Sequence, residues 1–454
     1  MLIERYLRDY LHAAQTPCKQ DAYFDTASIL HAAASNCAWT DETHRAIEFL
    51  SKRAEISRGL YESYQENGTR LSSYRLSEEL SILALVLLFK DFRRLFHNKI
   101  MTGAVKRLNG VLKLLDLLST ENIALLPGLT PLIKAEAEQF LETLQHTAPS
   151  SSVALTNTAR PLTTRDLPLT VLFWEGPIAR AYLATLKSMG LKPEKIIHLV
   201  SKNDLVTQKP LGRFLPRSLK VGYAQSRQKS SIHYWSTTLR KTRPALCRSI
   251  KETVESRLAF PEKVINDALA LEDLSEYSPD VETLMIGSLA DDTLYDRLLA
   301  LPETQILFTG GGIVPKNLLE IASLKFIHIH PGHLPEIRGA DCVLWSHLMK
   351  GCASATCFYM APGIDDGDII LASYLPPLEP HFDTCRTDLK TLYRATYAFL
   401  DPWVRAFVLR QALGETAGFT RTQAKPQAEH NSVTYHFMHE LVQRAAFAQL
   451  FAEK

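Results

Sequence analysis

The sequence predicts an α/β protein in which a doubly wound, mainly parallel sheet follows a separate all-helical N-terminal domain. From residue 169 onward, short apolar runs of strand type alternate with helical stretches, as in βαβ units. Residues 1–146 show apolar positions at helical spacing throughout. The stretch 147–168 is rich in Ser, Thr and Pro, as linkers are. We therefore expect a helical domain at 1–146, a linker at 147–168, an α/β domain at 169–413 and a short tail at 414–454.

The helical domain contains a long amphipathic segment at 77–118. Because this segment includes Gly103 and Gly110, which weaken a helix interior, at least two helices are expected there. The role of the domain stays open between substrate capture, dimerisation and partner binding.

The α/β domain is expected to begin with a βαβ unit, whose crossover should be right-handed. The predicted strands are 169–173, 195–200, 283–286, 306–309, 326–330 and 356–360, and the predicted helices are 178–188, 294–300, 342–349 and 388–413. This alternation is typical of a doubly wound sheet.

A basic insertion interrupts the alternation. Residues 201–251 carry twelve Lys or Arg and one acid, Asp204. Two interpretations remain open: a solvated insertion with local charge bias, or a surface that attracts an anionic substrate, a carrier protein or nucleic acid.

Composition and charge exclude several classes of protein. The net charge of the 454-residue chain is only +2, so a globally basic nucleic-acid binder is not indicated. The seven cysteines are odd in number and never spaced as CxxC, which argues against a disulfide framework or a structural zinc site. The N-terminus lacks the features of a signal peptide, and the longest apolar run, 82–89, is too short to span a bilayer. We expect a cytoplasmic protein with no membrane partner.

Two histidines end the predicted strand 326–330. Side chains two residues apart share one face of a strand, so His328 and His330 should point the same way. Pro331 cannot continue a central strand, which places His330 at the carboxyl end, where open α/β sheets bind ligands. Asp365 follows the next predicted strand in a loop that should open at the same edge. A carboxylate beside two imidazoles can keep one of them charged and relay protons.

Each of these features also has a purely structural interpretation. A strand histidine often only packs or donates a hydrogen bond, and an aspartate in a glycine-rich turn often caps that turn. The loop Gly310-Gly311-Gly312 permits close approach to a ligand but is equally suited to a tight turn. It is not a dinucleotide fingerprint, because GxGxxG is absent.

The motifs around these residues resemble a known family, the formyltransferases that use 10-formyltetrahydrofolate, which include methionyl-tRNA formyltransferase and glycinamide ribonucleotide transformylase. The resemblance covers roughly residues 168 to 413. The segments that carry it are His330-Pro331-Gly332-His333-Leu334-Pro335, Arg338-Gly339-Ala340, Trp345, Thr356 and Gly363-Ile364-Asp365-Asp366-Gly367-Asp368-Ile369. They are similar to the family's HPSLLP, RGA, Trp, Thr and GLDTGDI patterns. The resemblance implies a Rossmann-like sheet and an enzyme that transfers formyl groups.

The resemblance also implies roles for individual residues. The family's catalytic Asn, His and Asp fall on His328, His330 and Asp365, so that His328 replaces the Asn. Gly332 and His333 replace a Ser-Leu pair and, with Arg338, would contact the acceptor. The pterin pocket would be lined by Gly312, Ile313, Val314, Met360, Ala361, Pro362, Gly363 and Ile364.

The implied reaction is attack by an acceptor amine on the formyl carbon of 10-formyltetrahydrofolate, the co-substrate. His330 would assist proton transfer and the oxyanion, His328 would supply a second donor, and Asp365 would hold His330 protonated and take up the amine proton through water. Roughly 40 residues follow the last predicted helix, too few for the barrel domain of methionyl-tRNA formyltransferases. The resemblance therefore favours an amino sugar, an amino acid or a carrier-bound amine over nucleic acid, in a possible homo-oligomer.

Other interpretations stay open. His328, His330, His333 and Asp365 form a ligand set that zinc or iron could accept in a metal-dependent hydrolase. The missing Asn also permits a catalytically altered or non-catalytic regulatory module that binds folate. Hydrolysis of 10-formyltetrahydrofolate to formate is a further variant.

Overall fold

The computed structural model describes residues 78–120, 122, 125, 128–144, 164–212, 214–384, 386–428 and 432–451. The chain divides into two compact units. The first comprises Met1–Leu144 with Met438–Val442, and the second comprises Gln145–Phe437 with Gln443–Lys454. The expectations for residues 1–77 and for most of the linker lie outside the described residues.

The described part of the first unit is helical. It contains α4 (Glu78–His97), α5 (Met101–Thr120) and α6 (Leu129–Glu142). The break expected within 77–118 falls at residues 98–100, where Lys99 adopts a left-handed conformation with φ 58°, and both suspected glycines lie inside α5. Phe92 meets Phe140 edge to face at 5.2 Å, which packs α4 against α6.

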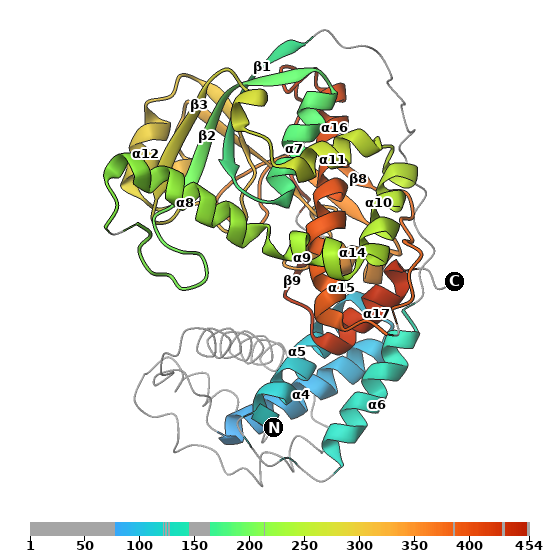
Figure 1. Cartoon of the computed structure of the whole chain (residues 1–454). Coiled ribbons are helices and arrows are strands. Elements are labelled where there is room, and N and C mark those ends of the chain that lie inside the picture. Colours follow the sequence, from blue (N-terminus) through green and yellow to red (C-terminus); the bar gives the residue numbers. More distant parts are fainter. Residues whose placement is uncertain are drawn as a thin grey trace. The chain divides into compact units, whose positions relative to one another are not determined.

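The second unit is built on a seven-stranded sheet with the order β3-β2-β1-β4-β5-β7-β8 (Figure 1). The strands are β1 (Arg165–Trp174), β2 (Leu191–Ser201), β3 (Val281–Ile286), β4 (Thr304–Phe308), β5 (Leu324–His330), β7 (Ser354–Tyr359) and β8 (Ile369–Tyr374). The five strands from β3 to β5 in this order are parallel, whereas β7 is antiparallel to β5 and β8 is antiparallel to β7. The prediction of a doubly wound, mainly parallel sheet is confirmed.

The direction of β7 corrects one expectation. Because β7 runs antiparallel to β5, its last residue, Tyr359, pairs with Ile327 rather than lying beside His330. The following loop therefore starts away from the carboxyl end of β5 and must turn back to reach it. Sequence periodicity carries no information on strand direction, which is why the expectation failed.

Helices account for most of the remaining described chain. They are α7 (Pro177–Ser188), α8 (Arg217–Ile232), α9 (Tyr234–Thr242), α10 (Pro244–Leu258), α11 (Glu262–Ala270), α12 (Asp292–Leu299), α13 (Lys316–Leu319), α14 (Cys342–Lys350), α15 (Leu389–Ala395), α16 (Asp401–Glu415) and α17 (Glu440–Leu450). A short 3-10 turn, η1 (Leu274–Glu276), precedes β3, and a π-helical turn, η2 (Thr396–Leu400), joins α15 to α16. A small ladder pairs β6 (Arg338–Gly339) with β9 (Thr434–Tyr435). The basic segment 201–251 thus consists largely of α8, α9 and half of α10.

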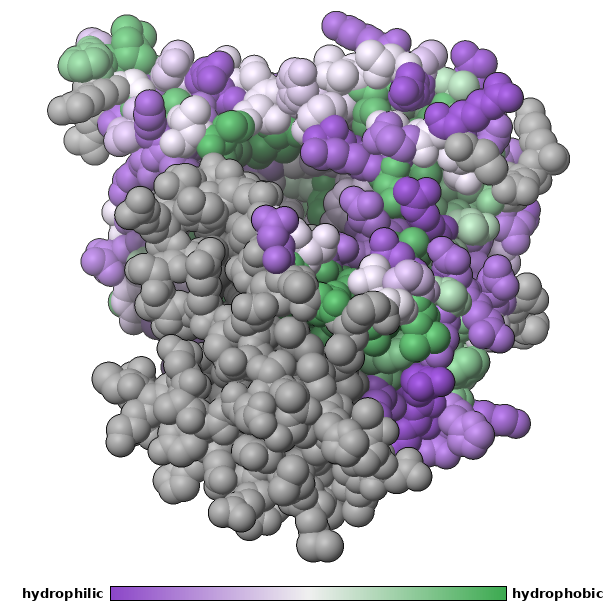
Figure 2. Space-filling view, turned by 90° about the horizontal axis from the view of Figure 1, so that it is seen from below, coloured by the Kyte–Doolittle hydropathy of each residue, from purple (hydrophilic) through white to green (hydrophobic). Residues whose placement is uncertain are grey.

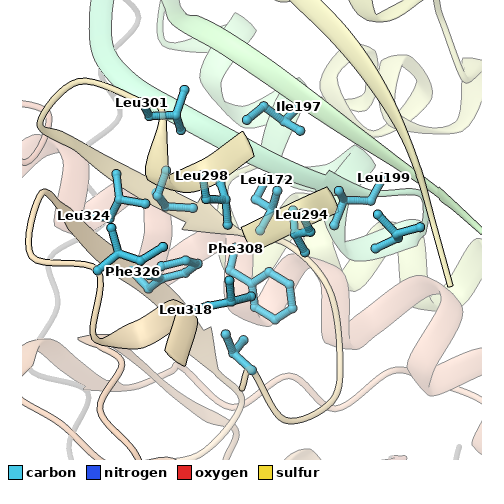
Figure 3. Packing of buried hydrophobic residues seen from close by; sticks show 14 residues of the cluster. Leu172, Ile197, Leu199, Leu294, Leu298, Leu301, Phe308, Leu318, Leu324 and Phe326 are labelled. Atoms are coloured by element: carbon cyan, nitrogen blue, oxygen red, sulfur yellow. The ribbon is translucent and has the colours of Figure 1, made fainter. Parts of the chain in front are cut away.

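Helices cover both faces of the sheet. On one face, Leu294 and Leu298 of α12 and Leu318 of α13 pack in one apolar cluster with strand residues that include Phe308 and Phe326 (Figure 3). The opposite face packs against other helices: Arg180 of α7 lies over the Phe173 ring, with 5.3 Å between its guanidinium carbon and the ring centroid. The core thus fixes the strands whose ends carry the site.

One face of the molecule shows how polar and apolar residues are distributed on the described part of its surface. On the face shown in Figure 2, apolar residues in green occur in separate groups among hydrophilic residues in purple. Among the described residues, no helix is both long and apolar enough to cross a membrane.

The core arrangement can be tested on α12, where Leu298 is fully buried and its neighbour Leu299 is 53% exposed. We expect Leu298→Ala to lower the free energy of unfolding by about 2–5 kcal/mol, because it leaves a cavity in the cluster. The matched change Leu299→Ala should cost about 0.5 kcal/mol or less. Urea denaturation followed by circular dichroism measures both free energies of unfolding. Equal losses of stability in the two variants would contradict the packing of Leu298 in the apolar cluster.

Candidate functional site

The apolar cluster ends where a polar site begins. Along β5, Phe326 packs in the cluster, and alternation brings His328 and then His330 to the same face. The ring of His328 lies 5.8 Å from that of Phe308, centroid to centroid. His330 is only 2% exposed, and Pro331 ends the strand immediately after it. The structure therefore places His328 and His330 on one face of β5, with His330 at the carboxyl end, as predicted.

The buried His330 pairs with the half-buried Asp365. His330 Nδ1 lies 3.2 Å from Asp365 Oδ1, and His330 Nε2 lies 3.0 Å from the carbonyl oxygen of Ile337. Both of these oxygens are acceptors, so the ring is fully hydrogen-bonded only in its doubly protonated, charged form. The ring can therefore carry a positive charge at the end of β5, balanced by the carboxylate of Asp365.

A strained loop carries the carboxylate back to His330. Asp365 has a left-handed backbone with φ 50°, and Gly363 and Gly367 have φ values of 147° and 121°. A Cβ at Gly367 would overlap the carbonyl oxygen of Tyr359. These conformations let the loop reverse direction after β7. Such strain is typical of functional loops.

The charge of Asp365 is stabilised from two sides. Its Oδ2 accepts a hydrogen bond from the Gly339 backbone N–H at 2.8 Å. Burial by itself would raise the pKa of this carboxyl, but the adjacent His330 and the Gly339 N–H outweigh burial and lower the pKa to about 2. The carboxylate thus stays charged at neutral pH.

His328 has a different protonation state. Its Nδ1 lies 3.2 Å from the carbonyl oxygen of Phe308, so Nδ1 carries the hydrogen and Nε2 has the free lone pair. Burial, with the positive charge of Arg405, lowers the pKa of His328 to about 4. At neutral pH the ring is uncharged, so Nε2 can accept a hydrogen bond but not donate one. The donor role implied by the family resemblance does not fit this tautomer.

A cavity of about 700 Å³ opens over these three residues. Seven of the eight residues expected in the pterin pocket line it: Gly312, Ile313, Val314, Met360, Ala361, Gly363 and Ile364. Pro362 does not line it. The side chains of Ile313 and Ile364 are 78% and 55% exposed, so apolar groups stand at the cavity mouth. The cavity has the size of a small-molecule site, with few polar groups on apolar walls.

Sequence reasoning missed the part of the cavity wall that comes from α15, η2 and α16. Tyr393 and Tyr397 donate hydrogen bonds to Asp341 Oδ1, at 2.7 and 3.0 Å. Arg405 is half-buried, donates to the carbonyl oxygen of Ile329 at 2.9 Å and pairs with Asp401 at 2.9 Å. The sequence offered one signal for this wall: the two tyrosines are four residues apart, which places them on one face of a helix.

The C-terminal segment also belongs to this site. Residues 434–437 line the cavity, and β9 pairs with β6 beside it. The Gln427 amide donates to the carbonyl oxygens of Asp365 and Gly367, at 3.1 and 2.8 Å, and so braces the loop that carries the carboxylate. No sequence signal pointed to Gln427.

The three residues expected at the acceptor side lie outside the cavity wall. The ring of His333 stacks on Tyr374 at 4.3 Å, and Arg338 donates to Gln427 Oε1 at 2.6 Å. Gly332 lies beneath the pair: a Cβ there would collide with the Ile337 carbonyl oxygen and lie 2.8 Å from His330 Nε2. Their contribution to acceptor binding stays a prediction.

The geometry gives no support to the metal-dependent hydrolase. In the part of the chain that the structure describes, no three histidine, cysteine or acidic side chains are grouped so that they could hold a metal ion. His333 is turned to Tyr374, and both ring nitrogens of His330 already face protein acceptors.

The first prediction from this geometry concerns pH. Asp365→Asn keeps the side-chain shape and tolerates the left-handed backbone, but removes the charge. Because the folded pKa, about 2, lies below the ordinary 3.8, the carboxylate stabilises the fold above about pH 4 and loses this effect as the pH falls toward 2. The shift corresponds to about 2 kcal/mol. The difference in unfolding free energy between the two proteins should therefore narrow from pH 6 to pH 3 in urea titrations; a constant difference would contradict the pair.

The second prediction concerns Gly332. Gly332→Ala should lower stability by about 1–3 kcal/mol, because the new methyl group forces the Ile337 carbonyl away from His330. Gly414→Ala is the matched control, since a Cβ at Gly414 in α16 meets nothing within 4 Å. Thermal denaturation compares them, and equal melting temperatures for the two variants would count against this contact.

Comparison with known proteins identifies relatives of a segment of the chain. No family model matches the chain. The methionyl-tRNA formyltransferase of Syntrophus aciditrophicus (strain SB) is 35% identical over 94 residues, which are 20% of this chain and 30% of that protein. The methionyl-tRNA formyltransferase of Clostridioides difficile (strain 630) is 36% identical over 84 residues, which are 18% of this chain and 27% of that protein. The chain thus spans less than a third of the length of these relatives.

Solved structures give a weaker likeness. The N-formyltransferase from Helicobacter canadensis, solved with folinic acid and dTDP-3-aminofucose, covers 63% of this chain and 80% of its own at 13% identity and a TM-score of 0.33. The fold assignment rests on the strand order of this chain itself. Over the segment shared with the curated relatives, the chain is related to the formyltransferases, as its motifs indicate.

Proposed function

We propose that this protein transfers a formyl group from 10-formyltetrahydrofolate to the amino group of a small-molecule acceptor. The observation that carries the proposal is the His330–Asp365 pair in the wall of a cavity of about 700 Å³. The relationship of a segment to methionyl-tRNA formyltransferases supports the same chemistry.

The cavity suits the co-substrate. Apolar side chains at Ile313, Val314, Met360 and Ile364 can cover a flat heterocycle, and the backbone of the neighbouring loops offers polar groups for its edge. The exposed apolar side chains at the mouth would be buried by a ligand of this kind, which favours binding.

In this proposal His330 acts through its charge. The tetrahedral intermediate places negative charge on the formyl oxygen, and a positive ring fixed in a water-poor site stabilises it. Asp365 acts on the substrate through His330, because it keeps the ring charged and oriented. Arg405, in the wall of the same cavity, adds positive charge nearby.

His328 is proposed as the acceptor for the proton of the attacking amine. Its Nε2 has a free lone pair, and its pKa of about 4 makes it the better base compared with Asp365, whose pKa is about 2. As the new C–N bond forms and the bond to the folate nitrogen breaks, the amine loses one proton and the departing nitrogen gains one. His328 can pass that proton between them.

Three residues outside the cavity wall have supporting roles in this proposal. Gly332 leaves room for the Ile337 carbonyl on His330, and Arg338 fixes Gln427, which braces the loop of Asp365. His333, stacked on Tyr374, shapes the side from which an amino sugar, an amino acid or a carrier-bound amine would approach.

The direct test is incubation of the full chain with 10-formyltetrahydrofolate and a panel of amines, with release of tetrahydrofolate as the readout. Release that requires one class of amine is the expected result, and release without an amine would indicate hydrolysis. Folate binding by calorimetry without any release would favour a regulatory module instead. Neither binding nor release would overturn the proposal.

Variants of the two histidines test the assigned roles. His330→Ala should lower turnover by about 10²-fold or more, because the charge next to the oxyanion is lost. His328→Asn should lower turnover by about 10²-fold, because an amide can accept and donate a hydrogen bond but cannot take up the proton of the amine. His381→Ala, at an exposed histidine outside the cavity, is the matched control. A folded His328→Asn protein with unchanged or raised turnover would contradict the role of His328 as proton acceptor.

A further inference from the structure

A second cavity lies apart from the candidate active site. It measures about 310 Å³, and its lining comes mainly from α9, α10, α11, η2 and the first turn of α16. Figure 1 labels α9, α10, α11 and α16. The apolar wall of the cavity includes Ile265 and Leu269 from α11 and Phe399 and Trp403 from η2 and α16. None of its lining residues lines the larger cavity. The proposed formyl transfer makes no use of it.

The lining of the cavity contains positively charged side chains but no acidic residue. Arg240, Arg248 and Lys251 belong to its lining, whereas no aspartate or glutamate does. Lys251 pairs with Glu262. Arg240 and Arg248 are exposed, and within the described residues neither forms an ion pair. Two guanidinium groups of the basic insertion thus remain available to an anion.

The Cys247 thiol in the wall is neutral. Burial raises the pKa of the Cys247 thiol to about 11, although Arg240 opposes this shift. The thiol therefore adds no negative charge to the interior at neutral pH.

The walls are held in place without a ligand. The His233 ring pairs with Glu175 at 2.9 Å, and the Ser236 hydroxyl donates to the His233 carbonyl oxygen at 2.9 Å. The Trp403 ring packs on Phe260 at 4.8 Å. A preformed cavity requires little ordering on binding, which favours affinity.

We propose that this cavity binds a small amphipathic anion, with an aromatic or alkyl body inside and a carboxylate, phosphate or sulfonate at Arg240 and Arg248. The apolar wall accounts for the body, and planar guanidinium groups bind such oxyanions in a bidentate manner. The volume is at the lower end of the range for small-molecule sites, so the ligand is compact.

The two cavities share a helical segment, which limits the choice of test variants. Tyr393, Tyr397 and Arg405 line the larger cavity, and Phe399 and Trp403 line the smaller one. Substitutions on η2 or α16 could disturb both, so the variants are placed on α9, α10 and α11.

The test uses 1-anilinonaphthalene-8-sulfonate, a dye with an apolar body and a sulfonate, on the full chain, with the dissociation constant measured by fluorescence. Arg240→Glu with Arg248→Glu should weaken binding by about tenfold or more. Lys241→Glu with Lys263→Glu makes the same charge change at exposed positions outside the cavity and should change binding less than about twofold. Equal weakening of dye binding by the two double variants would overturn the proposed site.

Two further experiments test whether the dye binds in this cavity and which ligand groups the cavity prefers. Ala268→Phe fills the cavity from α11 and should abolish this binding while the melting temperature shows a folded protein. Decanoate and phenyl phosphate should both displace the dye, but to different extents. The difference in their competition shows whether the cavity prefers an alkyl carboxylate or an aromatic phosphate. Displacement by inorganic phosphate alone, equal competition by neutral decanol, or unchanged dye binding in folded Ala268→Phe would each overturn the proposal.

Discussion

The pair of the buried His330 and the half-buried Asp365 is the interaction on which the site depends. Two charged groups can stay buried only if each finds partners, because an unpaired buried charge costs several kcal/mol. The partners come from separate segments: the Ile337 carbonyl holds one ring nitrogen and the Gly339 N–H holds one carboxylate oxygen. The position of each segment is therefore tied to the others, and the glycines in the loops make these close approaches possible.

The apolar core and the chemistry of the site are also linked. The cluster that packs α12 and α13 against the sheet ends at Phe308 and Phe326, directly beside His328. Burial beside this cluster lowers the pKa of His328, and the Phe308 carbonyl fixes its tautomer. The same packing that stabilises the sheet therefore decides that His328 accepts hydrogen bonds while His330 is suited to carry charge.

The site is assembled from parts of the chain that are far apart in sequence. The loop after β4, the end of β5, the loop of Asp365, the segment from α15 to α16 and the strand β9 all line one cavity. Gln427, more than sixty residues after Asp365, braces the loop of that carboxylate. The basic insertion lines a separate cavity, so the sheet domain contains two cavities whose walls differ in chemical character.

The sequence by itself determined six of the seven strands of the main sheet and the common face of His328 and His330, because periodicity and proline stops are local properties. It did not predict β8 or the helices α8 to α11. It also contained the motifs of the formyltransferases. Only the tertiary structure decided that β7 is antiparallel, that the Asp365 loop turns back, and that Tyr393, Arg405 and the C-terminal segment complete the wall. Strand direction, tautomer and burial arise from contacts between distant residues, and no local pattern of the chain encodes them.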